Sequence, residues 1–338
     1  MKSRNLLKFG LIAAAALMVF GCGSGNAASG DTSSASTAPA PTAEGKKLKI
    51  GVSIPSADHG WTGGVKYWAE QEMKKHPEIE WVYQTADNPA KQNESLDAML
   101  AQKIDGLVIL AHASEPLTPK AKELHDAGVF IVNVDRGFTE PIADIFLAGD
   151  NKAFGRISAE FIAKQLNGKG NVLVLEGVAC NVNTDRVEAA KEVWAKNPGI
   201  KVLDSQQADW NQQKAFEKMQ TMLVKHKEVN AIWAADDDMA LGAEKALKEA
   251  GRDKNIFILG GAGMKDIVKR VMDGDPMFPG DVTYPPSMIA KGIELAVKTM
   301  TGKTKEELKA WKSTNESVPI ELIEKANAKN FYFPDSIY

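Results

Sequence analysis

From residue 48 onward, short apolar runs alternate with longer stretches in which apolar residues recur every three or four positions. Several of the short runs are apolar at almost every position, which is typical of parallel strands that are buried on both faces. The longer stretches are typical of amphipathic helices. The short runs predict strands at residues 48–54, 80–85, 106–111, 129–135, 145–150, 171–177, 201–206, 231–236 and 256–261.

Helical patterns fill the spaces between these strands. A strand, a helix and a second strand at this spacing form a right-handed βαβ unit of an open parallel sheet. Because the units fall into two series, the pattern predicts an α/β protein with two Rossmann-like, doubly wound lobes and parallel sheets. Ligands of such sheets bind beyond the carboxyl ends of the strands, so we expect a cleft there. The predicted helices are 64–75, 91–102, 119–127, 153–166, 186–196, 212–226 and 239–251.

The first 46 residues have a different pattern. Three basic residues precede an apolar run at 9–20, which is shorter than the roughly 20 residues of a membrane span and matches the core of a secretory signal. The run ends at Val19-Phe20-Gly21-Cys22. This ending resembles a bacterial lipobox, which implies cleavage before Cys22 and a lipid on its sulfur. The alternative is an ordinary cleaved signal followed by an incidental cysteine.

The segment after the signal is rich in Gly, Ser, Ala, Thr and Pro. Such a segment buries too little apolar surface to offset its ordering entropy, so it is expected to be a flexible tether. We therefore predict a lipoprotein signal peptide at 1–21 and a lipidated tether at 22–46. The expected location is the bacterial cell envelope, with the body lipid-anchored in the periplasm or on the outer face of the cytoplasmic membrane.

Composition narrows the class of protein. The 338-residue chain is 44% hydrophobic and 25% charged with a net charge of −3, which is ordinary for a globular protein and argues against a nucleic-acid partner. The five histidines are scattered, and none has metal-ligand spacing with another or with Cys180. We therefore expect neither a metal nor a cofactor. No nucleophile or phosphate-loop motif appears, so the chain is not expected to be an enzyme.

The residues that follow the strands of the first series are candidate ligand contacts. Asp58, His59 and Trp61 come after the first strand. Trp61 offers a flat apolar face to a ligand and Asp58 or His59 bonds its polar edge, unless Trp61 only covers the core. Asp135 and Arg136 follow the fourth strand. They supply an acceptor and a fork of donors for neighbouring hydroxyls, unless they only pair with each other.

The second series offers a similar set. Asn183 and Arg186 follow its first strand, and they either reach the cleft or cap the next helix. Trp210 is placed like a second stacking platform. Asp236 begins a run of three aspartates, which suits a metal or a polyhydroxyl ligand. We favour one carboxylate in the cleft and the others at a helix N-terminus, where negative charge is favourable.

These strand ends carry a family resemblance. Segments such as VSIPSADHGWTGG, FIVNVDRGF and AADDDMALGAEKAL resemble the periplasmic sugar-binding family typified by ribose-binding protein, within the type I substrate-binding proteins of ABC transporters. The similarity runs in order through nearly all of 48–301. It implies lobes joined by a three-segment hinge, which close on a sugar and deliver it to a membrane permease. The ligand contacts that it implies are Trp61, Asp135, Arg136, Trp210 and Asp236.

Departures from the family pattern affect the ligand. The family's strand at 256–261 usually ends Phe-Asp-Gly, whose Asp binds sugar hydroxyls, whereas Gly261-Ala262-Gly263 stands here. A Gln often found near Thr283 is replaced, and Tyr284 follows as a candidate contact. A ligand hydroxyl buried without a partner costs roughly 1–3 kcal/mol, so the ribose pattern should not transfer. We expect another monosaccharide, a polyol or a cyclitol.

The resemblance also implies how the chain divides. The N-terminal lobe is expected at 47–150 plus about 284–310, and the C-terminal lobe at 151–283 plus about 311–338. Asp150, Asn151 and the segment near 282–286 are the hinge candidates. We expect a monomer whose partners are a small sugar or polyol and an ABC permease. The alternatives are a ligand-presenting sensor for chemotaxis or a membrane kinase, or a binder of a small molecule that is not a sugar.

Overall fold

The structure of this protein is a computed structural model that describes residues 47–57 and 60–338. The predicted signal peptide, the tether, Cys22, Asp58 and His59 lie outside the described residues and stay predictions.

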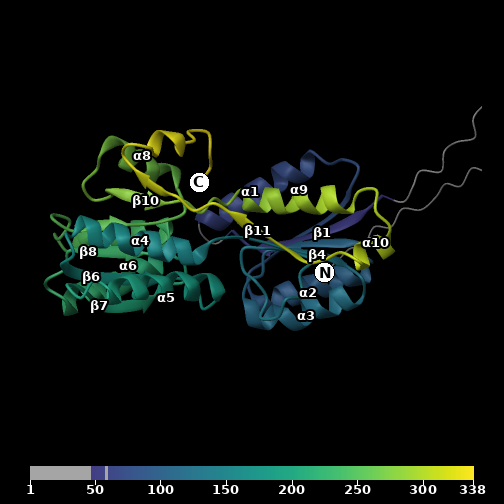
Figure 1. Cartoon of the computed structure of the whole chain (residues 1–338), viewed down its shortest axis with the longest axis horizontal. Coiled ribbons are helices and arrows are strands. Elements are labelled where there is room, and N and C mark those ends of the chain that lie inside the picture. The colour runs from purple at the N-terminus through teal and green to yellow at the C-terminus, as the bar shows by residue number, and fades with distance from the viewer. Residues whose placement is uncertain (1–46, 58–59) are drawn as a thin grey trace, which may run out of the picture. The chain divides into compact units, whose positions relative to one another are not determined.

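A six-stranded sheet forms the first lobe, with the strand order β11-β5-β4-β3-β1-β2. Every neighbouring pair in it is parallel. In Figure 1, α1 and α9 lie on one face of this sheet and α2 and α3 on the other. The elements are β1 (Lys49–Pro55), α1 (Gly60–Lys74), β2 (Glu80–Ala86), α2 (Pro89–Ala101), β3 (Gly106–Ile109), α3 (Ser114–Asp126), β4 (Phe130–Val134), β5 (Ile145–Gly149), α9 (Met288–Met300), α10 (Lys305–Lys309) and β11 (Thr314–Val318).

The core of this lobe follows from the alternation of side chains along each strand. Leu107 and Ile109 of β3 pack with the buried residues of α2 and α3. Val108, between them, points to the other face and packs with the residues of α1 and α9. All four residues of β3 are buried, which is why its sequence is a continuous apolar run.

The second lobe has a four-stranded parallel sheet with the order β7-β6-β8-β9. A two-stranded antiparallel pair of β10 and β12 belongs to the same half. The elements are α4 (Asn151–Gln165), β6 (Gly170–Glu176), α5 (Asn181–Ala195), β7 (Ile200–Gln207), α6 (Gln212–Lys225), β8 (Ala231–Ala234), α7 (Asp237–Glu249), β9 (Phe257–Leu259), α8 (Lys265–Asp273), β10 (Gly280–Val282), β12 (Leu322–Glu324) and the 3₁₀ turn η1 (Ala328–Asn330).

The chain passes between the lobes three times, as the family resemblance implied. It crosses between β5 and α4, between β10 and α9, and between β11 and β12. The last crossing falls later than expected. The segment from residue 311 was assigned to the C-terminal lobe, but β11 pairs with β5 in the six-stranded sheet. Its sequence TNESV is exposed and polar, so this edge strand gives no apolar signal in the sequence.

The nine predicted strands are confirmed to within a few residues, whereas most helices begin earlier than their apolar pattern indicates. Helix α1 begins at Gly60 and α5 at Asn181, each several residues before the predicted start. The first turns of these helices are polar or Gly-rich and therefore carry no amphipathic pattern. Trp61, which precedes the predicted start of this helix, therefore stands in the first turn of α1 and is 6% exposed.

Candidate functional site

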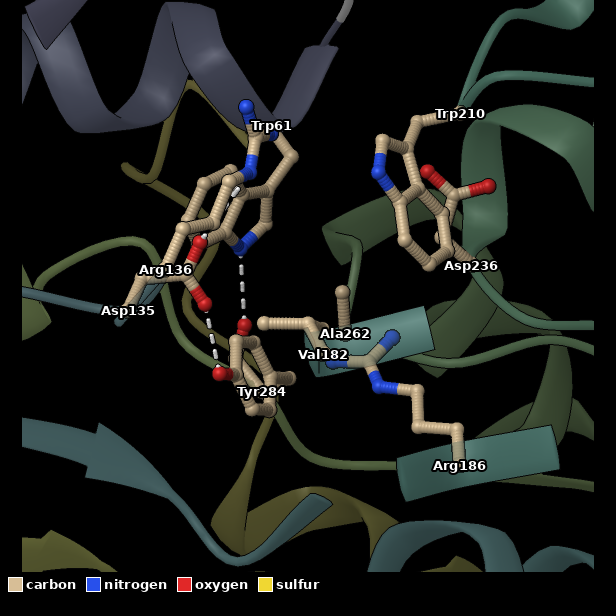
Figure 2. A pocket seen from close by; sticks show the side chains of 9 residues that line it. All are labelled: Trp61, Asp135, Arg136, Val182, Arg186, Trp210, Asp236, Ala262 and Tyr284. Atoms are coloured by element: carbon tan, nitrogen blue, oxygen red, sulfur yellow. Dashed lines mark hydrogen bonds and ion pairs between the residues drawn. The ribbon is translucent and has the colours of Figure 1, made fainter. Parts of the chain in front are cut away.

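A small cavity lies where the carboxyl ends of the two sheets meet (Figure 2). Every residue around it follows a strand or stands in the helix or crossing just beyond one. This is the position that open α/β sheets use for ligands. The cavity measures about 30 Å³, which is room for about two water molecules. Its walls are Trp61, Asp135, Arg136, Val182, Arg186, Trp210, Asp236, Ala262 and Tyr284.

The first lobe contributes a carboxylate and a guanidinium that are both held in place. The Tyr284 hydroxyl donates a hydrogen bond of 2.6 Å to Asp135 Oδ1. Arg136 Nε lies 3.6 Å from Asp135 Oδ2, and Arg136 Nη1 donates to the carbonyl of His112 over 2.8 Å. The ion pair that the sequence left as an alternative is therefore present, and both residues also line the cavity. Burial, and then the charge of Asp135, raises the pKa of Tyr284, so Tyr284 keeps its proton and stays a donor.

The second lobe contributes Arg186, which is buried among aromatic rings. Its Cζ atom lies 3.9 Å from the ring centroid of Phe154, 4.3 Å from that of Tyr284 and 5.4 Å from that of Trp210. Its Nε donates to Asn151 Oδ1 over 2.9 Å and its Nη1 donates to a main-chain carbonyl over 2.7 Å. Within the described part of the chain Nη2 has no partner, so it is the donor that remains for a ligand.

These groups form one hydrogen-bonded chain that runs from lobe to lobe. Arg186 donates to the side-chain oxygen of Asn151. The amide nitrogen of Asn151 donates to the Tyr284 hydroxyl over 3.2 Å, and Tyr284 donates in turn to Asp135. Because each member fixes the next, the cation of the second lobe and the anion of the first keep a defined spacing.

Two indole rings face the cavity from the two lobes, Trp61 from α1 and Trp210 from the loop after β7 (Figure 2). The Trp61 indole N–H donates to the carbonyl of Tyr284 over 2.9 Å. Trp210 lies against Gly177, where an added Cβ would stand 1.8 Å from the ring. A glycine is therefore required at 177 for Trp210 to reach this position.

The three successive aspartates have three different roles. Asp236 caps α7 by accepting from the backbone N–H of Met239 over 2.9 Å, and it also lines the cavity. Asp237 is fully buried and accepts from two backbone N–H groups of the loop after β9. Asp238 reaches across to the first lobe, where Gly60 N donates to its Oδ1 over 3.0 Å and Trp61 N to its Oδ2 over 3.3 Å. Capping the helix and lining the cavity, which we expect of different aspartates, thus fall on the same residue, Asp236.

Backbone strain is concentrated at this cavity. Asp135, Trp210 and Ala262 have φ angles of 68°, 59° and 118°, which L-residues rarely adopt. Each such conformation costs on the order of 1–3 kcal/mol and persists only where the surrounding structure holds it. Three strained residues out of nine around one cavity support the assignment of a functional site on grounds independent of its polar side chains.

One expected contact lies away from the cavity, one hinge candidate lies beside it, and two wall residues are not among the expected contacts. Asn183 does not line the cavity, because its amide bonds the backbone N–H of Gly177 and the Glu176 carboxylate. Asn151, expected at the hinge, lies between Arg186 and Tyr284 as described above. Val182 and Ala262 add apolar surface to the cavity wall, and no polar group in the sequence marks their positions. Ala262 stands where the resembling family places a carboxylate. That alignment is the one feature of the sequence that indicates a place for Ala262 in the site.

No cluster of residues suited to hold a metal ion occurs in residues 47–57 and 60–338. In the same residues, no helix is long and apolar enough to cross a membrane. Cys180, the one cysteine there, is a free thiol, and burial raises its pKa.

The sequence of this chain matches a known protein family and several characterised relatives. The family described as periplasmic binding protein domain matches residues 50–304. A xylitol-binding protein of Mycolicibacterium smegmatis is 29% identical over 275 residues, which cover 79% of this chain and 74% of the relative. A ribose import binding protein of Bacillus subtilis is 26% identical over 260 residues, which cover 76% of this chain and 83% of the relative.

A solved structure shows the same fold. It is an ABC transporter solute binding protein from Bacillus halodurans C-125 with bound myo-inositol. The TM-score is 0.78 at 21% sequence identity, and the match covers 88% of this chain and all of that one.

Proposed function

This chain belongs to the periplasmic binding protein family, and we propose that it is the solute-binding component of an ABC transporter. It captures a monosaccharide, a polyol or a cyclitol between its lobes and delivers it to a permease in the membrane. It binds the ligand without making or breaking a bond, so it is not an enzyme.

The observation that supports this proposal is the composition of the cavity wall. Each lobe contributes one indole ring and charged side chains to it: Trp61, Asp135 and Arg136 from the first, and Trp210, Arg186 and Asp236 from the second. Indole faces bury the apolar C–H face of a sugar, and carboxylates and guanidinium groups bond its hydroxyls in fixed geometry. A ligand held in this way contacts both lobes at once.

Ligand entry requires the lobes to part. Beside the cavity, the Asp238 carboxylate of the second lobe accepts from two backbone N–H groups at the start of α1 in the first lobe. The structure therefore corresponds to a closed arrangement. A ligand shifts the balance between open and closed forms only by its differential affinity for them. Since the proposed contacts come from both lobes, only the closed form makes them all.

We place the hinge at Asp150 and Asn151 together with the crossing that contains Tyr284. Asp150 caps α4 by accepting from Ala153 N over 2.8 Å. Asn151 bonds the carbonyl of Gly149 on one crossing and the hydroxyl of Tyr284 on another. Rotation at this point therefore moves the two crossings together, as hinge closure of periplasmic binding proteins requires.

Calorimetry with a panel of monosaccharides, polyols and cyclitols tests the function. We expect one of them to bind, and Trp61→Ala and Trp210→Ala each to weaken that binding by more than about 1 kcal/mol, the low end for a lost aromatic contact. Trp81→Ala, on β2 and outside the cavity, is the control and should leave the affinity unchanged. A panel without any binder, or full affinity in both cavity variants, would contradict the proposal. Ribose as the tightest ligand would overturn the ligand class we propose.

We also propose that the mature chain is a monomer anchored to the membrane by a lipid on Cys22. The support is the lipobox-like sequence and the tether composition. In cell fractionation, the wild-type protein should partition with membranes and Cys22→Ser with the soluble fraction. Light scattering of the Cys22→Ser protein should give the mass of one chain. Equal partitioning of the two proteins, or the mass of a dimer, would refute the respective part.

A further inference from the structure

A second and larger pocket lies beside the crossings, and we call it the crossing pocket. It measures about 670 Å³, within the range of small-molecule sites. It shares only Ala262 with the cavity of Figure 2. Its walls come from α1, from the last two crossings and from the chain after η1. It is therefore a separate space to which the proposed sugar site assigns no role.

Aromatic side chains dominate its walls. Tyr67 and Trp68 of α1 have ring centroids 5.4 Å apart and planes 80° apart, so they form a corner. Phe331 and Phe333 line the pocket from the chain after η1. Phe333 is 63% exposed, so its ring is accessible from solvent. With Tyr338, five aromatic rings from α1 and from the chain after η1 line this space.

The charged side chains of the crossing pocket all have one sign. Glu321 and Asp335 line it, and no lysine, arginine or histidine does. In the described part of the chain neither carboxylate takes part in an ion pair. The ammonium group of Lys265 lies nearby and donates to the carbonyl of Ser336 over 2.7 Å, so one positive charge stands beside the pocket. The pocket therefore combines aromatic rings with two carboxylates, one more negative charge than Lys265 offsets.

We propose that the crossing pocket binds an organic cation, an alkyl- or arylammonium ion. Ring faces attract such cations through their quadrupole, and quaternary ammonium groups are recognised by aromatic cages of this kind. The two carboxylates add Coulomb attraction, which salt weakens because both groups are exposed. Neutral ligands of the same shape gain only the apolar contact.

The experiment uses the full chain labelled with 5-fluorotryptophan. Each of its seven tryptophans gives a ¹⁹F resonance, and Trp68→Phe assigns the one in the pocket. The probe is choline, and its control is 3,3-dimethylbutan-1-ol, which has the same shape without the charge. We expect choline to shift the Trp68 resonance saturably, with at least a fivefold lower Kd than the alcohol, and added salt to weaken it.

A matched pair of variants tests the role of the carboxylates. Glu321→Gln combined with Asp335→Asn should raise the Kd of choline several-fold. Glu316→Gln combined with Asp266→Asn removes two exposed carboxylates outside the pocket and should leave the Kd unchanged. Unfolding curves verify that each variant is folded. No saturable shift at Trp68, equal affinity for the alcohol, or shifts only at Trp61 and Trp210 would overturn the proposal. The last result would place the cation in the sugar cavity.

Discussion

The hydroxyl of Tyr284 donates to Asp135 Oδ1 over 2.6 Å, although 149 residues separate them along the chain. Asp135 follows a strand of the first lobe and Tyr284 stands on a crossing between the lobes. Both oxygens of this carboxylate therefore contact the protein itself, Oδ1 through Tyr284 and Oδ2 through Arg136. A ligand that uses Asp135 must share one of them.

Removal of that hydroxyl should destabilise the protein. In Tyr284→Phe the buried carboxylate of Asp135 loses a charge-assisted hydrogen bond, and Asn151 loses an acceptor. We expect the free energy of unfolding without ligand to fall by about 1–3 kcal/mol, measured by urea denaturation. Tyr332→Phe is the control, because the Tyr332 hydroxyl makes no hydrogen bond within the described residues. Equal stability of wild type and Tyr284→Phe would show that the bond contributes nothing.

Arg186 should not be replaceable by lysine. Its guanidinium stacks on Phe154 and Tyr284 while it bonds Asn151 and a carbonyl, and an ammonium group cannot reproduce this planar geometry. We expect Arg186→Lys to weaken ligand binding at least tenfold in calorimetry.

Arg156→Lys is the matched control for this substitution, since Arg156 is exposed on α4 and, among the described residues, pairs only with Glu160. The interpretation of Arg186 fails if both lysine variants keep wild-type affinity.

Asp238 should favour closure without touching the ligand. Its carboxylate accepts from Gly60 N and Trp61 N, so it caps the first turn of α1 from the opposite lobe. Asp238→Asn keeps one acceptor but loses the charge that favours a helix N-terminus. We expect a threefold to tenfold loss of ligand affinity and a larger radius of gyration in solution scattering.

Asp266→Asn, in the exposed first turn of α8, should change neither the affinity nor the radius. An unchanged radius in Asp238→Asn would show that the contact between the lobes does not hold them closed.

A buried pair of carboxyl groups should make stability depend on pH. Asp281 is 0% exposed, and burial raises its pKa to about 7. Burial, and then the charge of Asp281, also raises the pKa of Asp237. Asp236, Asp238 and the phenol of Tyr338 are the other titratable groups beside them, and they supply no positive charge.

The sign follows from proton binding. Asp281 in the folded state holds its proton up to about pH 7, whereas in the unfolded chain it loses the proton near pH 4. The folded state therefore binds more protons between these values, and this contribution to stability is lost as pH rises from about 4 to 7. Asp281→Asn imitates the protonated acid. We therefore compare the free energy of unfolding of Asp281→Asn with that of wild type at each pH. This difference should be about 1–4 kcal/mol more favourable to the variant at pH 8 than at pH 5.

Urea denaturation of both proteins at the two pH values measures this difference. The same difference between variant and wild type at pH 5 and pH 8 would rule out a buried acid that titrates in this range.

The sequence determined the architecture, because short apolar runs such as 106–111 and 171–177, each followed by an amphipathic helical stretch, are typical of parallel strands covered by helices. It also placed Trp61, Asp135, Arg136, Arg186, Trp210, Asp236 and Tyr284 at strand ends or crossings, since ligands of these sheets gather there. The order of strands and helices is a local property, and the hydrophobic pattern records it directly.

Only the tertiary structure decided which of those residues bond one another and which face the cavity. Arg186, Asn151, Tyr284 and Asp135 form one chain of hydrogen bonds, although no spacing in the sequence relates them. Asn183 in the first turn of α5 bonds Gly177 and Glu176 and does not line the cavity. Asp238 in the first turn of α7 bonds the other lobe. These hydrogen-bond partners are set by the packing of one lobe on the other. The hydrophobic periodicity of the sequence reports local structure and does not depend on that packing.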